Sequence, residues 1–210
     1  MAGRRSPGQR AGLSRERVLD AALAIADRDG LAALTMRKLG GELGVEAMTL
    51  YHHLPNKDAL LDGLVERVLE LATPPEGGDW AASMRGYAIS LRAILKEHPG
   101  VLSIAATRPA VTPRTLQIVE RSLALLRGAG FELGLALDLV NALSVFVIGH
   151  VAAEMAIPAA PVMDTKEFPL LDEAVRTGAG VDDETRFLHA VDALLVGFGQ
   201  ASARPTNEAT

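Results

Sequence analysis

The sequence contains no cysteine among its 210 residues. A disulfide framework, a thiolate nucleophile and a cysteine-ligated zinc site are therefore excluded. Aromatic residues are also few, at 4% of the chain, and no stretch alternates apolar and polar residues as a half-buried strand would. Apolar residues instead recur at spacings of three and four, which is typical of amphipathic helices. The sequence therefore predicts an all-α protein.

Long hydrophobic runs are missing as well. The longest charge-free apolar stretch covers the 15 residues from Leu139 to Ala153, and three polar residues interrupt it, Asn141, Ser144 and His150. A helix that crosses a bilayer needs about 20 apolar residues, so we expect no membrane span. The N-terminus has arginines but no apolar core before Ser14, which is unlike a secretory signal. We therefore expect a soluble, cytoplasmic protein.

The net charge of -5 hides an uneven distribution of the two signs. Residues 1–57 hold 9 Lys and Arg against 6 Asp and Glu, whereas residues 58–210 hold 12 against 20. A basic first quarter on an acidic remainder indicates an anion-binding head joined to a body with another task. Residues 1–12 combine Gly, Pro, Ser and Arg with little to bury. We expect a flexible basic arm there, or an inert frayed terminus.

Local signals predict a series of helices. Ser14 is the predicted N-cap of a first helix that ends near Gly30. Thr35 is predicted to cap a short second helix, which Gly44 ends because glycine accepts left-handed backbone geometry. A third short segment covers residues 47–53. Pro55 and Asn56 then break the chain, and a longer helix opens at position 57 or 58 and runs to about 72.

A linker with the sequence TPPEGGD covers residues 73–79. It separates a first domain, 13–73, from a second domain, 79–203. In the second domain we predict helices over 80–97, 101–106, 113–128, 133–155 and 184–200. Residues 156–170 contain three prolines and are expected to form a long loop, with a short helix near 170–177.

The run from Leu34 to Leu61 has the order of a helix-turn-helix: a capped short helix, a glycine turn, a second short helix and a Pro-Asn-Lys break. Gly40 supplies the small residue where the two helices cross, and Leu50 and Leu54 should face the core. The outward side chains suit DNA, because hydroxyls, imidazoles and basic groups reach phosphates or base edges. Buried anchors are expected at Leu39, Leu43, Val45 and Leu50. The predicted DNA contacts are Arg37, Lys38, Ala47, Met48, Thr49, Tyr51, His52, His53 and Lys57.

The same run resembles the DNA-binding head of the tetracycline-repressor (TetR) family of bacterial transcriptional regulators. In that family a Thr-x-Arg-x-Leu start, a Leu-Gly-Val turn and a Thr-Leu-Tyr-x-His-x-x-x-Lys segment recur. The matching residues are Thr35, Arg37, Leu39, Leu43, Gly44, Val45, Thr49, Leu50, Tyr51, His53 and Lys57.

The resemblance implies a three-helix DNA-binding domain that contacts double-stranded operator DNA. It implies backbone contacts from Arg37, Thr49, Tyr51, His53 and Lys57. Base edges would lie near Ala47 and Met48. Tetracycline repressors have Gln-Pro at these last two positions, so we expect a different operator sequence.

A fainter resemblance continues into the second domain, at Trp80, at Thr107-Arg108-Pro109 and at Gly130-Phe131. It implies a larger helical domain for ligand binding and dimerisation, in which helices 133–155 and 184–200 form a four-helix bundle with a second subunit. The last helix agrees with this, because it carries one apolar stripe. The alternative is that both helices are intramolecular core. The stripe consists of Leu188, Val191, Leu195 and Phe198.

The resemblance also bears on the effector. The metal–tetracycline site of the tetracycline repressor uses histidines, whereas this chain has Ile104 and Leu71-Ala72-Thr73 at the corresponding places. We therefore expect a more apolar effector, with no metal and no cofactor. Its candidate contacts could equally be core residues, and Arg108 could instead cap a helix or pair with an acid. They are Met84, Tyr87, Leu91, Ile104, Thr107 and Arg108.

No catalytic signature is present. The sequence has no HExxH, GxSxG or phosphate-loop pattern. His150 and Glu154 are four residues apart and could share a helical face as a metal or acid–base pair, which we consider the weaker reading. We expect no enzyme, but a ligand-responsive regulator, most simply a repressor, that binds a palindromic operator as a homodimer. The alternative is a helical small-molecule-binding or scaffold protein that does not bind DNA.

Overall fold

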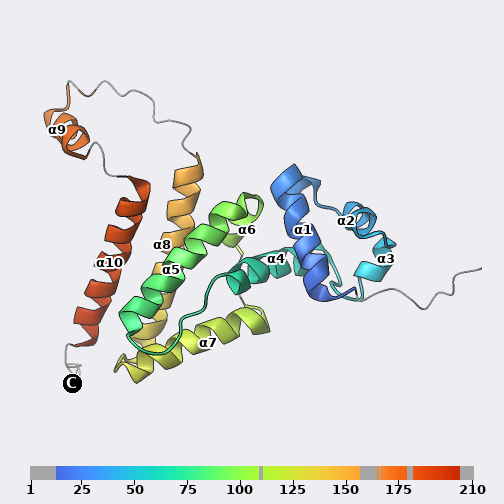
Figure 1. Cartoon of the computed structure of the whole chain (residues 1–210), viewed down its shortest axis with the longest axis horizontal. Helices are drawn as coiled ribbons and strands as arrows, with labels where there is room; N and C mark the ends of the chain where they lie inside the picture. Colours follow the sequence, from blue (N-terminus) through green and yellow to red (C-terminus); the bar gives the residue numbers. More distant parts are fainter. Residues whose placement is uncertain (1–12, 109–110, 157–164, 166, 179–181, 204–210) are drawn as a thin grey trace, which may run out of the picture. The chain divides into compact units, whose positions relative to one another are not determined.

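A computed structural model of the chain describes residues 13–108, 111–156, 165, 167–178 and 182–203. These residues form ten α-helices and two short 3-10 helices, and no strand occurs among them (Figure 1). The prediction of an all-α protein is confirmed. The basic arm expected at 1–12 lies outside the described residues, as does most of the loop expected at 156–170.

The chain divides into two compact units. The head unit contains Met1–Leu71 and His98–Thr115, and the body unit contains Ala72–Glu97 and Leu116–Thr210. The head unit therefore takes in a segment, 98–115, that follows the first helix of the body. The helices of the first 71 residues are α1 (Arg15–Asp29), η1 (Leu31–Ala33), α2 (Met36–Leu43), α3 (Ala47–Leu50) and α4 (Lys57–Leu71). The later ones are α5 (Trp80–Glu97), η2 (Pro99–Val101), α6 (Leu102–Ala105), α7 (Pro113–Gly128), α8 (Leu133–Ala156), α9 (Pro169–Gly178) and α10 (Asp183–Ser202).

The predicted caps set the ends of the head helices. The Ser14 hydroxyl accepts a hydrogen bond from the Arg17 amide at 3.2 Å and opens α1, and the Thr35 hydroxyl does the same for α2 through the Lys38 amide at 3.1 Å. Each side chain satisfies a backbone N–H that the first turn of a helix leaves without a partner. Gly44, with φ of +66°, ends α2 in the left-handed conformation that was predicted for it.

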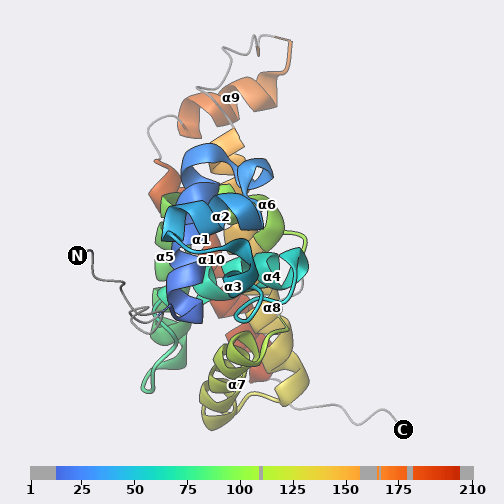
Figure 2. The ribbon, with the colours of Figure 1, turned by 90° about the vertical axis from the view of Figure 1, so that its right-hand side faces the viewer.

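The core of the head lies between α1, α2 and α4, as Figure 2 shows for α1 and α2. The carboxylate of Glu66 is also buried there, and the Arg15 guanidinium pairs with it through both terminal nitrogens. A buried carboxylate needs such a partner because desolvation otherwise penalises its charge. The fully buried side chains of the head include Val18, Leu19, Ile25, Leu34, Leu39, Leu50, Leu54, Leu60 and Leu64.

Segment 98–115 is attached to α1 by a close backbone approach and an ion pair. His98 Nδ1 lies 2.7 Å from Asp27 Oδ2, and the Gly100 amide donates to Asp27 Oδ1 at 3.1 Å. A Cβ atom at Gly100 would lie 2.3 Å from the Ala26 carbonyl oxygen. The approach therefore requires glycine at this position.

The same segment is attached to α4 by arginines. Arg108 Nε donates to Asp62 Oδ1 at 2.7 Å, and its Nη2 donates to Asp58 Oδ1 at 3.0 Å. Arg114 Nη1 donates to Glu70 Oε1 at 2.9 Å. The hydrogen bond to Asp62, and then the one to Asp58, raise the pKa of Arg108 further above its usual value. Arg108 thus pairs with acids, which was the alternative to its role as an effector contact.

The body is built around α5, α8 and α10, which all contact one another. Glu154 on α8 pairs with two cations of α5, at 3.0 Å from Arg92 Nη2 and 2.5 Å from Lys96 Nζ. The Arg92 guanidinium also lies over the Phe187 ring of α10, 5.1 Å from its centroid. These contacts join all three helices at one end of the body core.

Helix α8 has 24 residues and is, by length and composition alone, apolar enough to cross a membrane. It packs against α5 and α10, with Leu139, Leu143 and Val147 fully buried. Another side of α8 remains uncovered in the protomer, where Val145 is 71% exposed. A core helix of a soluble protein passes the same composition test, and this packing identifies α8 as such a helix.

Candidate nucleic-acid interface

The turn between α2 and α3 brings the two helices into very close contact. A Cβ atom at Gly40 would lie 2.8 Å from the Val45 carbonyl oxygen and 3.3 Å from the Ala47 amide nitrogen. Only glycine fits here without displacement, as predicted from its position in the sequence. Leu39 and Leu50 are fully buried on either side of the turn, whereas Leu43 and Val45 are half-buried.

Helix α3 is shorter than the segment 47–53 that was predicted. It ends at Leu50, and the chain then tightens into a turn in which the amides of His53 and Leu54 both donate to the Leu50 carbonyl at 2.9 Å. Pro55 explains the early end, because the residue before a proline is pushed out of helical geometry. A last turn with i to i+3 hydrogen bonds is the usual result.

The side chains of α3 and its turn divide as predicted between core and surface. Leu50 and Leu54 are buried and anchor the segment. Met48 is 70% exposed and Tyr51 41% exposed. Large apolar groups at such exposure are out of place on a polar head unless something covers them. The remaining predicted contacts on this segment are exposed at His52 and half-buried at Ala47, Thr49 and His53.

The basic residues beside this surface are not equivalent. Arg37 and Lys57 are exposed, and within the described chain neither forms an ion pair. Lys38 Nζ instead lies 2.8 Å from Asp29 Oδ2. The hydrogen bond from Lys38, followed by the one from Arg28, lowers the pKa of Asp29. Arg37 and Lys57 are therefore the freer cations for an anionic partner, a difference that the sequence pattern did not reveal.

The expected effector contacts fall into two groups. Met84, Tyr87 and Leu91 lie on the buried face of α5 in the body unit, and burial raises the pKa of Tyr87 to about 12. Ile104, Thr107 and Arg108 belong to the head unit. There Ile104 is buried, and the Thr107 hydroxyl donates to the Ser103 carbonyl at 2.8 Å. That these residues contact an effector stays a prediction.

The apolar stripe expected to meet a second subunit is only partly on the surface. Val191 and Leu195 are already buried inside the protomer, against α5 and α8, while Leu188 and Phe198 are half-buried. The exposed apolar side chains of these helices are others, chiefly Val145 on α8 and Val196 on α10. Periodicity missed them because α8 is apolar around most of its circumference.

His150 and Glu154 do not form the metal or acid–base pair considered from their spacing. Glu154 is held by Arg92 and Lys96, whereas the His150 ring packs against Phe146 and Phe187 at centroid distances of 5.5 and 5.1 Å. No cluster of three potential metal-ligating side chains occurs within the described part of the chain.

Comparisons with known proteins agree with this geometry. Residues 18–64 match the family model of bacterial regulatory proteins, tetR family, and residues 73–201 match that of the tetracyclin repressor-like C-terminal domain. The chain is 38% identical over 198 residues to the tetracycline repressor protein class D of Escherichia coli, covering 89% of each sequence.

Solved structures give the same result. The TetR family protein ActR of Streptomyces coelicolor, in complex with actinorhodin, superposes with a TM-score of 0.78 at 28% identity, covering 92% of this chain and 100% of that one. A variant of TetR from Acinetobacter baumannii AYE, in complex with minocycline, has a TM-score of 0.70 at 30% identity and the same coverage. The chain therefore belongs to the tetR family of bacterial regulatory proteins, with a tetracycline-repressor-like C-terminal domain.

Proposed function

We propose that this chain is a ligand-responsive transcriptional repressor that binds a palindromic operator as a homodimer and releases it when a small, mainly apolar effector binds. The observation that carries the proposal is the exposed surface of α3 on a head of this family. Met48, Tyr51 and His52 project from that surface, and Arg37 and Lys57 flank it. Operator DNA in a bacterial cell lies in the cytoplasm, so we place the protein there.

On the operator, α3 would lie in the major groove, as the second helix of a helix-turn-helix does. Met48 and Ala47 are placed to meet base edges, where an apolar side chain can contact a thymine methyl group. The hydroxyls of Thr49 and Tyr51 would bind backbone phosphates together with the cation of Lys57. Phosphate contacts set the position on the duplex, whereas base contacts select its sequence.

A second copy of the chain is proposed to cover the uncovered faces of α8 and α10. Val145 is 71% exposed and Val196 is 59% exposed, and Gly197 beside Val196 leaves room for a close helix approach. A hollow of about 240 Å³ lies between Leu135 of α8 and a patch on α10 that includes Phe198. Apolar surface of this kind on two adjacent helices is typical of an interface. Leu188 and Phe198 stay candidates for this face, and Val191 and Leu195 would support it from inside.

The effector is proposed to be small and mainly apolar. Two relatives bind actinorhodin and minocycline, according to their structures. The expected contacts of this chain on α5, Met84, Tyr87 and Leu91, present an apolar surface with one hydroxyl. We expect no metal to take part, because the positions matched to the histidines of the tetracycline repressor hold other residues.

Operator binding is tested by fluorescence anisotropy with a labelled duplex from the region upstream of the protein's own gene, against a scrambled duplex. If six to ten phosphates are contacted, affinity should fall about 10³ to 10⁵-fold between 50 and 200 mM salt. Tyr51→Ala should weaken binding without changing the oligomeric state. Lys57→Gln should reduce the salt slope by about 0.9, whereas the exposed body variant Arg121→Gln should leave it unchanged. No association at low salt would favour the scaffold alternative.

Dimerisation is tested by sedimentation of Val145→Asp and Val196→Asp. Each should yield monomers that bind operator poorly, because one head alone loses half of the palindrome. A fully dimeric double variant would remove this face from the interface. Release is tested by linkage, since an effector that lowers operator affinity must itself bind less tightly when operator is present. A switch from 99:1 to 1:99 requires about 5.5 kcal/mol of differential binding.

A further inference from the structure

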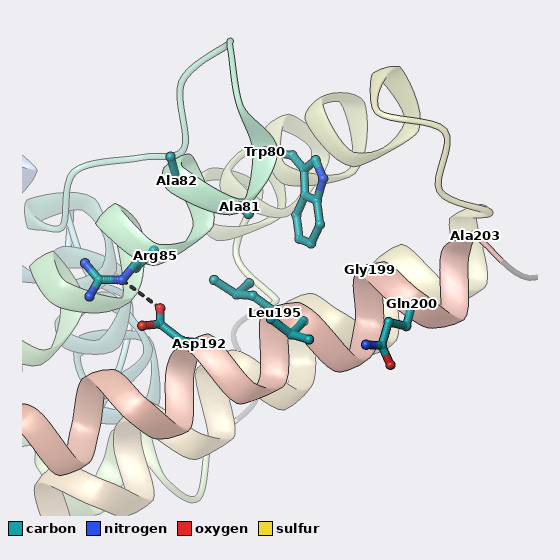
Figure 3. Close-up of a pocket in the computed structure, with 10 residues that line it drawn as sticks. Trp80, Ala81, Ala82, Arg85, Asp192, Leu195, Gly199, Gln200 and Ala203 are labelled. Atoms are coloured by element: carbon teal, nitrogen blue, oxygen red, sulfur yellow. Dashed lines mark hydrogen bonds and ion pairs between the residues drawn. The ribbon is translucent and has the colours of Figure 1, made fainter.

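A cavity of about 510 Å³ opens on the body unit between the start of α5 and the end of α10 (Figure 3). Its volume lies within the range of about 300–1,000 Å³ that is usual for small-molecule sites. Four of its lining residues have almost no side chain, which creates the space between the two helices. They are Ala81, Ala82, Gly199 and Ala203.

One wall of the cavity is the indole of Trp80, which extends toward α10 (Figure 3). The ring is held in place from two sides. Phe131 packs edge-to-face against it at a centroid distance of 4.7 Å, and a Cβ atom at Gly199 would lie 3.2 Å from Trp80 Cζ2. Leu195 forms an apolar floor. A fixed indole beside aliphatic groups favours a flat aromatic ligand, because offset stacking adds to the burial of apolar area.

The opposite end of the cavity is polar. Arg85 Nε donates to Asp192 Oδ1 at 2.7 Å, and the pair is partly exposed at the rim (Figure 3). Among the described residues, the two terminal amino groups of Arg85 have no hydrogen-bond partner. They can donate to an oxygen acceptor, and a carboxylate suits their fork geometry. Asp192 beside them disfavours a second negative charge on the ligand.

We propose that this cavity binds a planar aromatic monocarboxylate, with its rings against Trp80 and its carboxylate at Arg85. The site goes beyond the proposed function. It uses Ala81, Ala82 and Arg85 of α5, which lie apart from the buried face expected to meet the effector. It also lies on a different flank of α10 from the hollow beside α8.

Trp80 is the only tryptophan of the sequence, so its emission reports directly on this cavity. The full-length dimer is titrated with 2-naphthoate, and binding is followed by Trp80 fluorescence and by calorimetry. We expect saturable quenching at one site per chain. Arg85→Gln should weaken 2-naphthoate about tenfold but change the binding of the uncharged analogue 2-naphthalenemethanol much less. Arg127→Gln, an exposed arginine of the same unit, is the matched control.

A second variant, Ala82→Phe, fills the cavity from an exposed position and should abolish binding of both compounds. Both cavity variants should bind operator like the parent, so failure of this site is distinguishable from failure of the proposed function. The proposal is overturned if Trp80 emission does not respond. It is also overturned if calorimetry detects binding without quenching, as at the effector site, or if Ala82→Phe binds as tightly as the parent. Quenching that appears only in a monomeric Val196→Asp protein would show that a second copy covers the cavity, and would overturn it as well.

Discussion

Gly40 and Gly41 provide a test of the helix crossing on which the interface depends. They are neighbours in α2, and neither has a positive φ. Replacing either with alanine favours the helix by about 0.8–1.0 kcal/mol, because glycine loses more backbone entropy on folding. At Gly41 nothing lies within 4 Å of the new Cβ atom, so the gain should appear in full. At Gly40 the new atom would lie 2.8 Å from the backbone oxygen of Val45.

A backbone oxygen cannot rotate away as a side chain can, so Gly40→Ala should cost about 1–3 kcal/mol of overpacking. After the helical gain, the net loss is up to about 2 kcal/mol, while Gly41→Ala gains up to about 1 kcal/mol. Urea unfolding of the two variants and the parent measures the difference. Gly40→Ala should also bind operator more weakly, because α3 is displaced. Equal stability and equal operator affinity of the two variants would refute the close approach.

Two further predictions concern protonation in the body. Burial alone raises the pKa of Glu154, but the hydrogen bond from Lys96 and the charge of Arg92 outweigh it and leave that pKa below its usual value. The stabilisation is therefore present above the unfolded pKa of about 4.3 and is lost as the pH falls. Glu154→Gln should lose about 1.5–3 kcal/mol at pH 7 and approach the parent in acid unfolding curves. A constant gap at all pH values would contradict this. Burial raises the pKa of Tyr87 to about 12, so stability should decline as the pH rises above the unfolded value of about 10. In a Tyr51→Phe variant, ultraviolet absorbance should detect this single phenol ionising near 12, and completed ionisation by pH 10 would disprove its burial.

Local signals in the sequence predicted much of the head. Ser14 and Thr35 cap helices through their own hydroxyls, and Gly44 adopts the left-handed conformation, because each effect acts over only a few residues. The exposure of Tyr51 also followed from the helical positions of its neighbours. Such signals are strong because they do not depend on the rest of the fold.

What the sequence could not predict depends on residues far apart in the chain. The ion pair of Lys38 with Asp29 weakens one expected phosphate contact, and no spacing rule joins those positions. The burial of Leu195 required knowing which face of α10 meets α5 and α8, because both of its neighbouring faces are also apolar. Periodicity identifies an apolar stripe but does not say which surface covers it.

The inclusion of segment 98–115 in the head unit has a consequence for engineering. A chimeric regulator that joins this DNA-reading part to a foreign sensor at residue 72 would discard the partners of Asp27, Asp58 and Asp62. It would also leave the close backbone approach at Ala26 unfilled. Transplants should therefore bring His98 through Thr115 along as a second graft, or redesign the three carboxylates left without partners.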